Sequence, residues 1–117
     1  MNKKVRLIHH RLIEQHDIGS GPPKGVDLIQ APKLWNKTKG EGITVAILDT
    51  GCETDHPNLK ENIVGGRNFT NDDDGNPEIF EDYNGHGTHV AGTIGANPLE
   101  SKGILGVAPN VNLLILK

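Results

Sequence analysis

The chain has 117 residues, a formal net charge of −3, 34% hydrophobic residues and one cysteine. This length fits one domain with a modest core, since domains of about 100 to 150 residues are the commonest size. The mild negative charge excludes a basic surface for nucleic acid or an anionic membrane, and the single cysteine excludes a disulfide framework and favours a reducing cytoplasm.

The first expected element is an N-terminal extension over residues 1–18, in which apolar and basic residues alternate. It has no uninterrupted apolar core of signal-peptide length, which disfavours secretion. No apolar run in the chain approaches the roughly 20 residues that cross a bilayer. The glycines and prolines of GSGPPKG, residues 19–25, predict a flexible joint before a domain over residues 26–117.

The domain pattern combines strands and helices. A short helix is expected to begin near Pro32, with Trp35 packing against its surroundings. The apolar run ITVAIL, residues 43–48, is typical of a parallel strand buried on both faces. A weaker strand, a polar surface loop, a helix and a second apolar strand follow, over residues 63–69, 70–78, 86–96 and 111–116. This order predicts an α/β fold with a parallel sheet and flanking helices.

Two residues with catalytic chemistry stand at element ends. Asp49 follows the strand at 43–48, and His86 begins the helix at 86–96. Catalytic groups of open α/β sheets gather at the carboxyl ends of strands, and a carboxylate beside an imidazole activates a serine hydroxyl. We therefore predict an Asp49 oxygen about 2.6 to 3.2 Å from His86 Nδ1.

A metal site is the main alternative for these residues. His89 follows His86 by one helical turn, so two imidazoles and Asp49 make a candidate zinc site. The zinc signature HExxH is absent, and we expect no metal here. Cys52 follows Asp49 closely, and without a matched base its expected role is packing.

The acidic loop matches part of an EF-hand pattern. Its candidate ligand positions are Thr70, Asp72, Asp74, Gly75 and Glu81. The leading Asp of that pattern is replaced by Thr, and no helical pattern flanks the loop. A solvated surface loop is the favoured interpretation.

Longer motifs carry a resemblance to a known family. The segments VRLIHH, IQAPKLW, ILDTGC, GGRNFT, DYNGHGTHVAGT, GVAP and LLILK resemble the intracellular bacterial branch of the subtilisin family of serine proteases. The resemblance implies a partial subtilisin-like parallel sheet with flanking helices, incomplete at the C-terminus, with the strand at 43–48 beside the third strand. It also implies a serine endopeptidase whose triad has the order Asp, His, Ser, with Asp49 and His86 as its first two members.

The family nucleophile has no counterpart in these residues. Ser20 and Ser101 are the chain's serines, and neither has the GTSMA-like context of the family serine. We therefore expect the chain to hold the Asp and the His but not the Ser, and to be inactive alone. The alternative is a non-catalytic truncated relative that acts as a binding or regulatory module.

The resemblance carries further expectations about regulation and partners. In relatives the N-terminal extension lies across the active site as an inhibitor, and this chain has His9 and His10 where Pro and Tyr are expected. Protein or peptide substrates are implied, with a homodimer possible in the full-length form. The chemistry needs no cofactor. A structural calcium ion stays open, because Asn58 occupies a usual carboxylate position and the loop at 96–103 is one residue longer than usual.

Overall fold

The structure is a computed structural model that describes residues 21–98 and 103–117. The predicted extension at 1–18 and residues 19 and 20 of the predicted joint lie outside these ranges. Within them, no helix has the length and apolar character needed to cross a membrane. In chain order the elements are α1 (Lys24–Leu28), the 3₁₀ helix η1 (Ala31–Leu34), β1 (Thr44–Leu48), β2 (Ile63–Arg67), the 3₁₀ helix η2 (Asp72–Gly75), α2 (His86–Gly95) and β3 (Asn112–Leu116).

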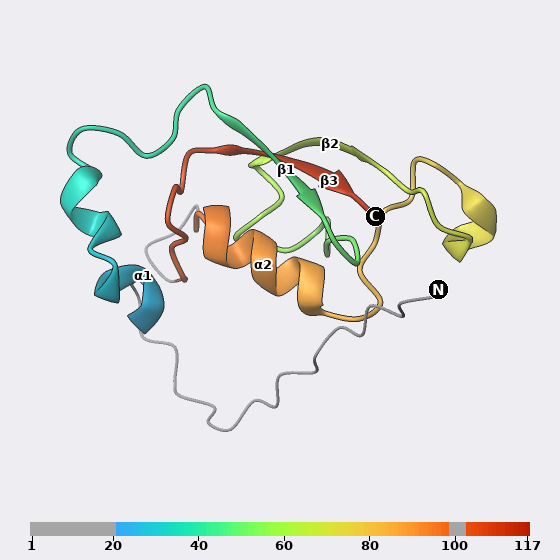
Figure 1. The fold of residues 1–117 in the computed structure, drawn as a ribbon, viewed down its shortest axis with the longest axis horizontal. Helices are drawn as coiled ribbons and strands as arrows, with labels where there is room; N and C mark the ends of the chain where they lie inside the picture. Colours follow the sequence, from blue (N-terminus) through green and yellow to red (C-terminus); the bar gives the residue numbers. More distant parts are fainter. Residues whose placement is uncertain (1–20, 99–102) are drawn as a thin grey trace, which may run out of the picture.

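The three strands form one parallel sheet in the order β1-β3-β2 (Figure 1). In β1 and β3, Thr44 pairs with Asn112 and Leu48 with Leu116, without a break in register. The pairing of β2 with β3 shifts register between Ile63 and Gly65. The predicted α/β class is confirmed, as is the expected adjacency of the first and third strands. Because the strands are parallel, their carboxyl ends share one edge of the sheet.

Helix α2 packs on one face of this sheet and forms the core with it (Figure 1). The side chains of Leu113 and Ile115 are fully buried there, and each contributes roughly 1.5 to 3 kcal/mol by leaving water. The helix comes close because its inner side is built from small residues. A Cβ on Gly95 would lie 2.8 Å from Val111 Cγ1, so glycine is needed for this approach.

The opposite face of the sheet is exposed, which corrects one prediction. Thr44, Ala46 and Leu48 alternate with more buried neighbours along β1, and Leu48 is 77% exposed. The expectation that this strand is buried on both faces is therefore wrong. An apolar run indicates that a strand can be covered on both sides. In the described part of the chain, α2 covers only one face of the sheet.

The first helix also differs from expectation. It begins at Lys24, where Pro23 in an extended conformation stands as the N-cap, and it ends at Leu28. Lys24 and Gly25, the last residues of the predicted joint, belong to this helix. Gln30 then adopts a left-handed conformation with φ 64°, so Pro32 falls in the 3₁₀ turn η1 and not at the start of an α-helix. Proline suits such a first turn because it has no N–H to leave unpaired.

Candidate active site

Asp49 and His86 are hydrogen-bonded at the carboxyl edge of the sheet. His86 Nδ1 lies 2.8 Å from Asp49 Oδ1 and 3.0 Å from Oδ2, which confirms the predicted distance. A carboxylate accepts hydrogen bonds, so the proton of the pair resides on Nδ1 and leaves Nε2 available as a base. The Asp49 side chain is 13% exposed and that of His86 36%, so the carboxylate is sheltered while the imidazole still reaches solvent.

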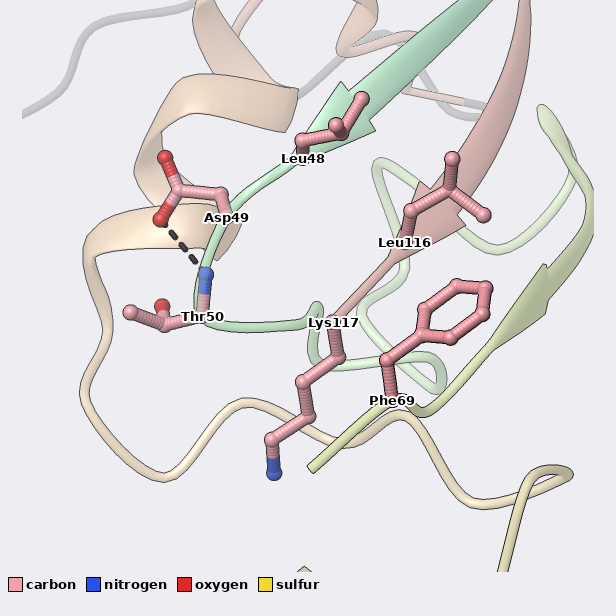
Figure 2. Close-up of a pocket in the computed structure, with 6 residues that line it drawn as sticks. All are labelled: Leu48, Asp49, Thr50, Phe69, Leu116 and Lys117. Carbon is pink, nitrogen blue, oxygen red and sulfur yellow. Dashed lines mark hydrogen bonds between the residues drawn. The ribbon is translucent and has the colours of Figure 1, made fainter.

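Two backbone contacts position Asp49. It follows the last residue of β1, and its own N–H donates to the Leu116 carbonyl at 3.1 Å, which extends the β1–β3 ladder by one bond. The N–H of Thr50 donates to Asp49 Oδ1 at 2.7 Å (Figure 2). The carboxylate is thereby held between the next backbone amide and the imidazole.

Side chains from three positions accept the first N–H groups of α2, which no helical carbonyl can satisfy. Asn84 Oδ1 accepts from the N–H of His86 at 3.2 Å, and Thr50 Oγ1 accepts from that of Gly87 at 2.9 Å. Asp82 Oδ2 accepts from the N–H of Thr88 at 2.9 Å. The helix start that carries His86 is thus anchored to the turn after β1 and to the loop before α2.

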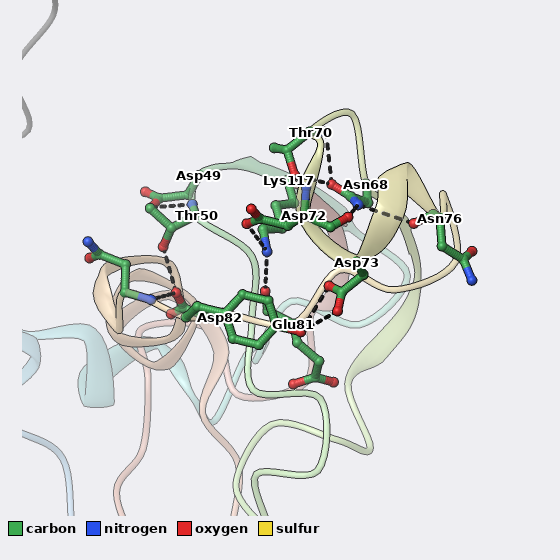
Figure 3. Close-up of polar contacts among 12 residues, drawn as sticks. Asp49, Thr50, Asn68, Thr70, Asp72, Asp73, Asn76, Glu81, Asp82 and Lys117 are labelled. Carbon is green, nitrogen blue, oxygen red and sulfur yellow. Dashed lines mark hydrogen bonds and ion pairs between the residues drawn. The ribbon is translucent and has the colours of Figure 1, made fainter.

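Asp82 is the centre of this network (Figure 3). Its carboxylate accepts hydrogen bonds from Thr50 Oγ1, Thr88 Oγ1 and the N–H groups of Asn84, Gly85 and Thr88. Burial alone would raise the pKa of Asp82, but these bonds outweigh it and lower the pKa to about 2. Sequence reasoning missed Asp82 and Thr50. An Asp close before a predicted helix start was the available signal, since such residues cap helices.

The turn after β1 and the first turn of α2 are in direct contact. A Cβ on Gly87 would lie 2.1 Å from the Gly51 carbonyl oxygen, closer than a real Cβ atom can approach. Gly51 itself has φ 105°, and a Cβ there would lie 2.6 Å from the Phe80 carbonyl oxygen. Gly87 thus lets the start of α2 approach the turn that follows Asp49, and Gly51 lets that turn pack against the loop before α2.

An apolar hollow of about 640 Å³ opens beside Asp49 at the ends of β1 and β3 (Figure 2). Leu48, Leu116 and Phe69 form its apolar part, and Thr50 and Lys117 complete its lining with Asp49. Its size lies within the range of about 300 to 1,000 Å³ that is usual for ligand pockets. The carboxyl edge of the sheet therefore has a surface against which apolar groups can pack.

The structure does not gather the residues of the alternative metal site. His89 lines a separate groove of about 770 Å³ between α1 and α2, whereas Asp49 lines the hollow at the sheet edge. Over residues 21–98 and 103–117, no three His, Cys, Asp or Glu side chains are grouped so that they could hold a metal ion. Cys52 is fully buried in the core, and burial raises the pKa of its thiol to about 11, which suits packing better than reactivity.

The acidic loop is organised by a buried amide. Asn68 accepts hydrogen bonds from the N–H and hydroxyl of Thr70, and its Nδ2 donates to the carbonyls of Asp72 and Asn76 (Figure 3). Carboxylates of the EF-hand pattern have separate partners. Asp72 pairs with Lys117 Nζ at 2.8 Å, and Glu81 accepts from the Thr54 hydroxyl. The segment is an exposed surface loop, as predicted.

Asn58, at which the expectation of a structural calcium ion stays open, carries an amide and not a carboxylate. Its side chain lies against Gly103, because a Cβ on that glycine would be 2.9 Å from Asn58 Oδ1. Residues 99–102 of the adjoining loop lie outside the described ranges.

A parallel α/β sheet that presents an Asp at a strand end to a His at a helix start has the arrangement of an α/β serine hydrolase. The model of the subtilase family matches residues 40–117, two thirds of the chain, and the chain belongs to this family. Its relatives are named as serine proteases and subtilisins.

Two of the named relatives match the whole chain. It is 58% identical over 117 residues to the "Intracellular serine protease" of Paenibacillus polymyxa and covers 36% of that protein. It is 53% identical over 118 aligned positions to the "Major intracellular serine protease" of Bacillus subtilis (strain 168), of which it covers 37%. The "Thermitase" of Thermoactinomyces vulgaris is 42% identical over 97 residues, which are 83% of this chain and 32% of that protein. The chain therefore spans about a third of the length of these relatives.

Proposed function

We propose that this chain supplies the Asp and His of a subtilisin-type triad, with Asp49 as the orienting carboxylate and His86 as the general base. The observation that carries the proposal is the hydrogen bond from His86 Nδ1 to Asp49, 2.8 Å long, at the carboxyl edge of the sheet. The membership of the subtilase family supports it. The activity of the complete protein is peptide-bond hydrolysis.

In this mechanism Asp49 holds the Nδ1–H tautomer and stabilises the imidazolium that forms. Nε2 of His86 takes the proton from a serine hydroxyl as its oxygen attacks the scissile carbonyl, and then gives that proton to the leaving amine. The serine of the family stands in a GTSMA-like motif, and neither Ser20 nor Ser101 has that context. The 117-residue chain thus brings the base and its orienting group to the reaction, and the nucleophile comes from elsewhere in the complete protein.

Further assignments belong to the same proposal. The protein acts in the cytoplasm, which the names of the intracellular relatives from Paenibacillus polymyxa and Bacillus subtilis support. Residues 1–18 act as an inhibitory extension, which the match of VRLIHH to the family extension supports. The complete protein forms a homodimer, as the resemblance to the intracellular branch implies. Proteins or peptides are the substrates, and the chemistry needs no cofactor.

The test is Asp49→Asn in the complete protein that carries this chain, assayed on a chromogenic peptide. The amide favours the wrong histidine tautomer, so kcat should fall about 10⁴-fold, the size known for triads of this type, including subtilisin's own. The matched control is Asp55→Asn, the same change at an exposed position six residues further on, which should leave kcat unchanged.

Labelling identifies the chemistry independently. A fluorophosphonate should label the complete wild-type protein at one serine and stop hydrolysis. Activity that survives phenylmethylsulfonyl fluoride and disappears with a chelator would instead establish the metal site of His86 and His89. Equal activity in the Asp49→Asn and wild-type proteins would refute the assigned role of the carboxylate.

A further inference from the structure

We infer that Thr50 and Asp82 are positioning residues that set the Asp49–His86 hydrogen bond by tying the end of β1 to the start of α2. The kinetic part of this inference rests on the proposed function, and its structural part does not. One hydrogen bond joins the two residues directly: Thr50 Oγ1 donates to Asp82 Oδ1 at 2.8 Å (Figure 3).

Thr50 contacts both halves of the pair. Its N–H donates to Asp49 Oδ1 at 2.7 Å and so orients the carboxylate. Its hydroxyl accepts from the N–H of Gly87 at 2.9 Å, next in sequence to His86, while donating its own proton to Asp82. The Thr50 hydroxyl therefore acts as donor and acceptor at once. Thr50 positions both the carboxylate of Asp49 and the start of the helix that carries the His86 imidazole.

Asp82 holds the other side of the helix start. Its Oδ2 accepts from both the N–H and the hydroxyl of Thr88, at 2.9 and 2.7 Å. Its Oδ1 accepts from Thr50 and from the N–H of Gly85, which precedes His86. His86 is thus bracketed by anchored residues on both sides, so a rotation of α2 about its axis would break several of these bonds together.

This precision matters because proton transfer depends steeply on geometry. A misplacement of about 1 Å in a reacting group costs on the order of 100-fold in rate. Thr50→Val keeps the shape of the side chain and removes its donor and acceptor, which leaves the Gly87 N–H and one Asp82 oxygen without that partner. Thr50→Ser keeps the hydroxyl and is the conservative rescue.

The experiment uses the complete protein with ¹⁵N-labelled histidine. In the wild type, the Nδ1 proton of His86 should give a downfield resonance that exchanges slowly with water. In Thr50→Val we expect this resonance to broaden or disappear and kcat to fall about 10- to 100-fold, with KM unchanged. Thr50→Ser should restore both. Asp82→Asn should resemble Thr50→Val, and combining the two changes should cost less than the product of their separate effects, because they break the same bond.

Thr54→Val is the matched control. Thr54 also donates its hydroxyl to a carboxylate, that of Glu81, but this bond does not touch α2. The control should lower Tm without changing the His86 resonance or kcat. A Thr50→Val protein that loses Tm but keeps the wild-type resonance and kcat would overturn the inference and leave Thr50 a purely structural role. If Thr50→Val does not fold, Asp82→Asn decides by the same criteria. If the complete protein has no peptidase activity, the proposed function fails and the resonance alone decides the positioning role.

Discussion

Two polar clusters lie near the carboxyl edge of the sheet, and they serve different ends (Figure 3). The Asp82 cluster consists of the side chains of Thr50, Asp82 and Thr88. It joins residues far apart in the chain, because Thr50 and Asp82 are separated by 32 positions. The Asn68 cluster is local, since the amide bonds reach no further than Asn76, eight residues on. Both satisfy backbone groups with a single side chain.

The difference lies in what each cluster holds in place. The side-chain bonds of Asn68 close a surface loop between Asn68 and Asn76. The bonds of Asp82 fix the distance between β1 and α2, and with it the distance from Asp49 to His86. A local cluster therefore stabilises the loop that contains it, whereas a cluster that bridges distant elements also determines the geometry of a site.

The largest expected effect is the loss of turnover in a chain that positions Asp49 and His86 but lacks the nucleophile. The 117-residue chain, expressed alone, should show no turnover of a chromogenic peptide and no labelling by a fluorophosphonate, with or without zinc. Loss of the nucleophile from a triad lowers kcat by about 10⁶, the size known for subtilisin's triad, so an intact Asp82 cluster cannot compensate. Stoichiometric labelling at Ser20 or Ser101, found by mass spectrometry, would contradict this prediction.

The next prediction concerns the local cluster. Asn68 is 4% exposed, and Asn68→Ala removes its bonds to the loop backbone, so the free energy of unfolding should fall by about 2 to 3 kcal/mol. The kcat of the complete protein should stay at the wild-type value, because Asp49 and His86 keep their partners. Denaturant unfolding and peptide assays measure the two quantities.

Asn71→Ala is the control for this change. Asn71 is exposed and makes no side-chain cap to η2, so its loss should affect neither quantity. A large fall in kcat for Asn68→Ala would show that the two clusters are coupled, and the distinction between them would fail.

The sequence alone predicted the elements that have a regular period or a chemical signature. The expected helix at 86–96 corresponds to α2, and the expected strand at 43–48 corresponds to β1. The approach of Asp49 to His86 followed from strand-end and helix-start positions. Apolar patterns and terminal residues are properties of short segments, so they can be recognised without knowing the fold.

What sequence reasoning missed depends on contacts between distant segments. The bonds of Thr50 to Asp82 and Gly87 leave no periodic signal, since they depend on the way the sheet edge meets the helix. The early helix was misplaced because a left-handed Gln30, which separates α1 from η1, has no strong local signature. The exposure of Leu48 depends on what covers the sheet, which the strand's own residues do not specify.

The smallest expected effect is a change in pH dependence at the Asp82 cluster. The pKa of Asp82 in the folded chain is lowered from 3.8 to about 2. A lowered folded-state pKa means that the ionised group stabilises the fold above its unfolded pKa and that this stability is lost as pH falls through the folded pKa. The wild-type Tm should therefore decline between pH 3.8 and about pH 2 partly through this group.

Asp82→Asn removes that titration, so its Tm should be lower at neutral pH and should decline less over the same acidic interval. Asp74→Asn, at an exposed carboxyl of the neighbouring loop, is the control and should keep the wild-type slope. Because Asp82 is partly open to solvent, the expected difference in slope is modest, and thermal melts at several closely spaced pH values are needed. Parallel curves for Asp82→Asn and the wild type would mean that the charge of Asp82 does not contribute to holding the start of α2. The Asp82 cluster would then differ from the Asn68 cluster in the sequence separation of the residues that it joins, but not in electrostatics.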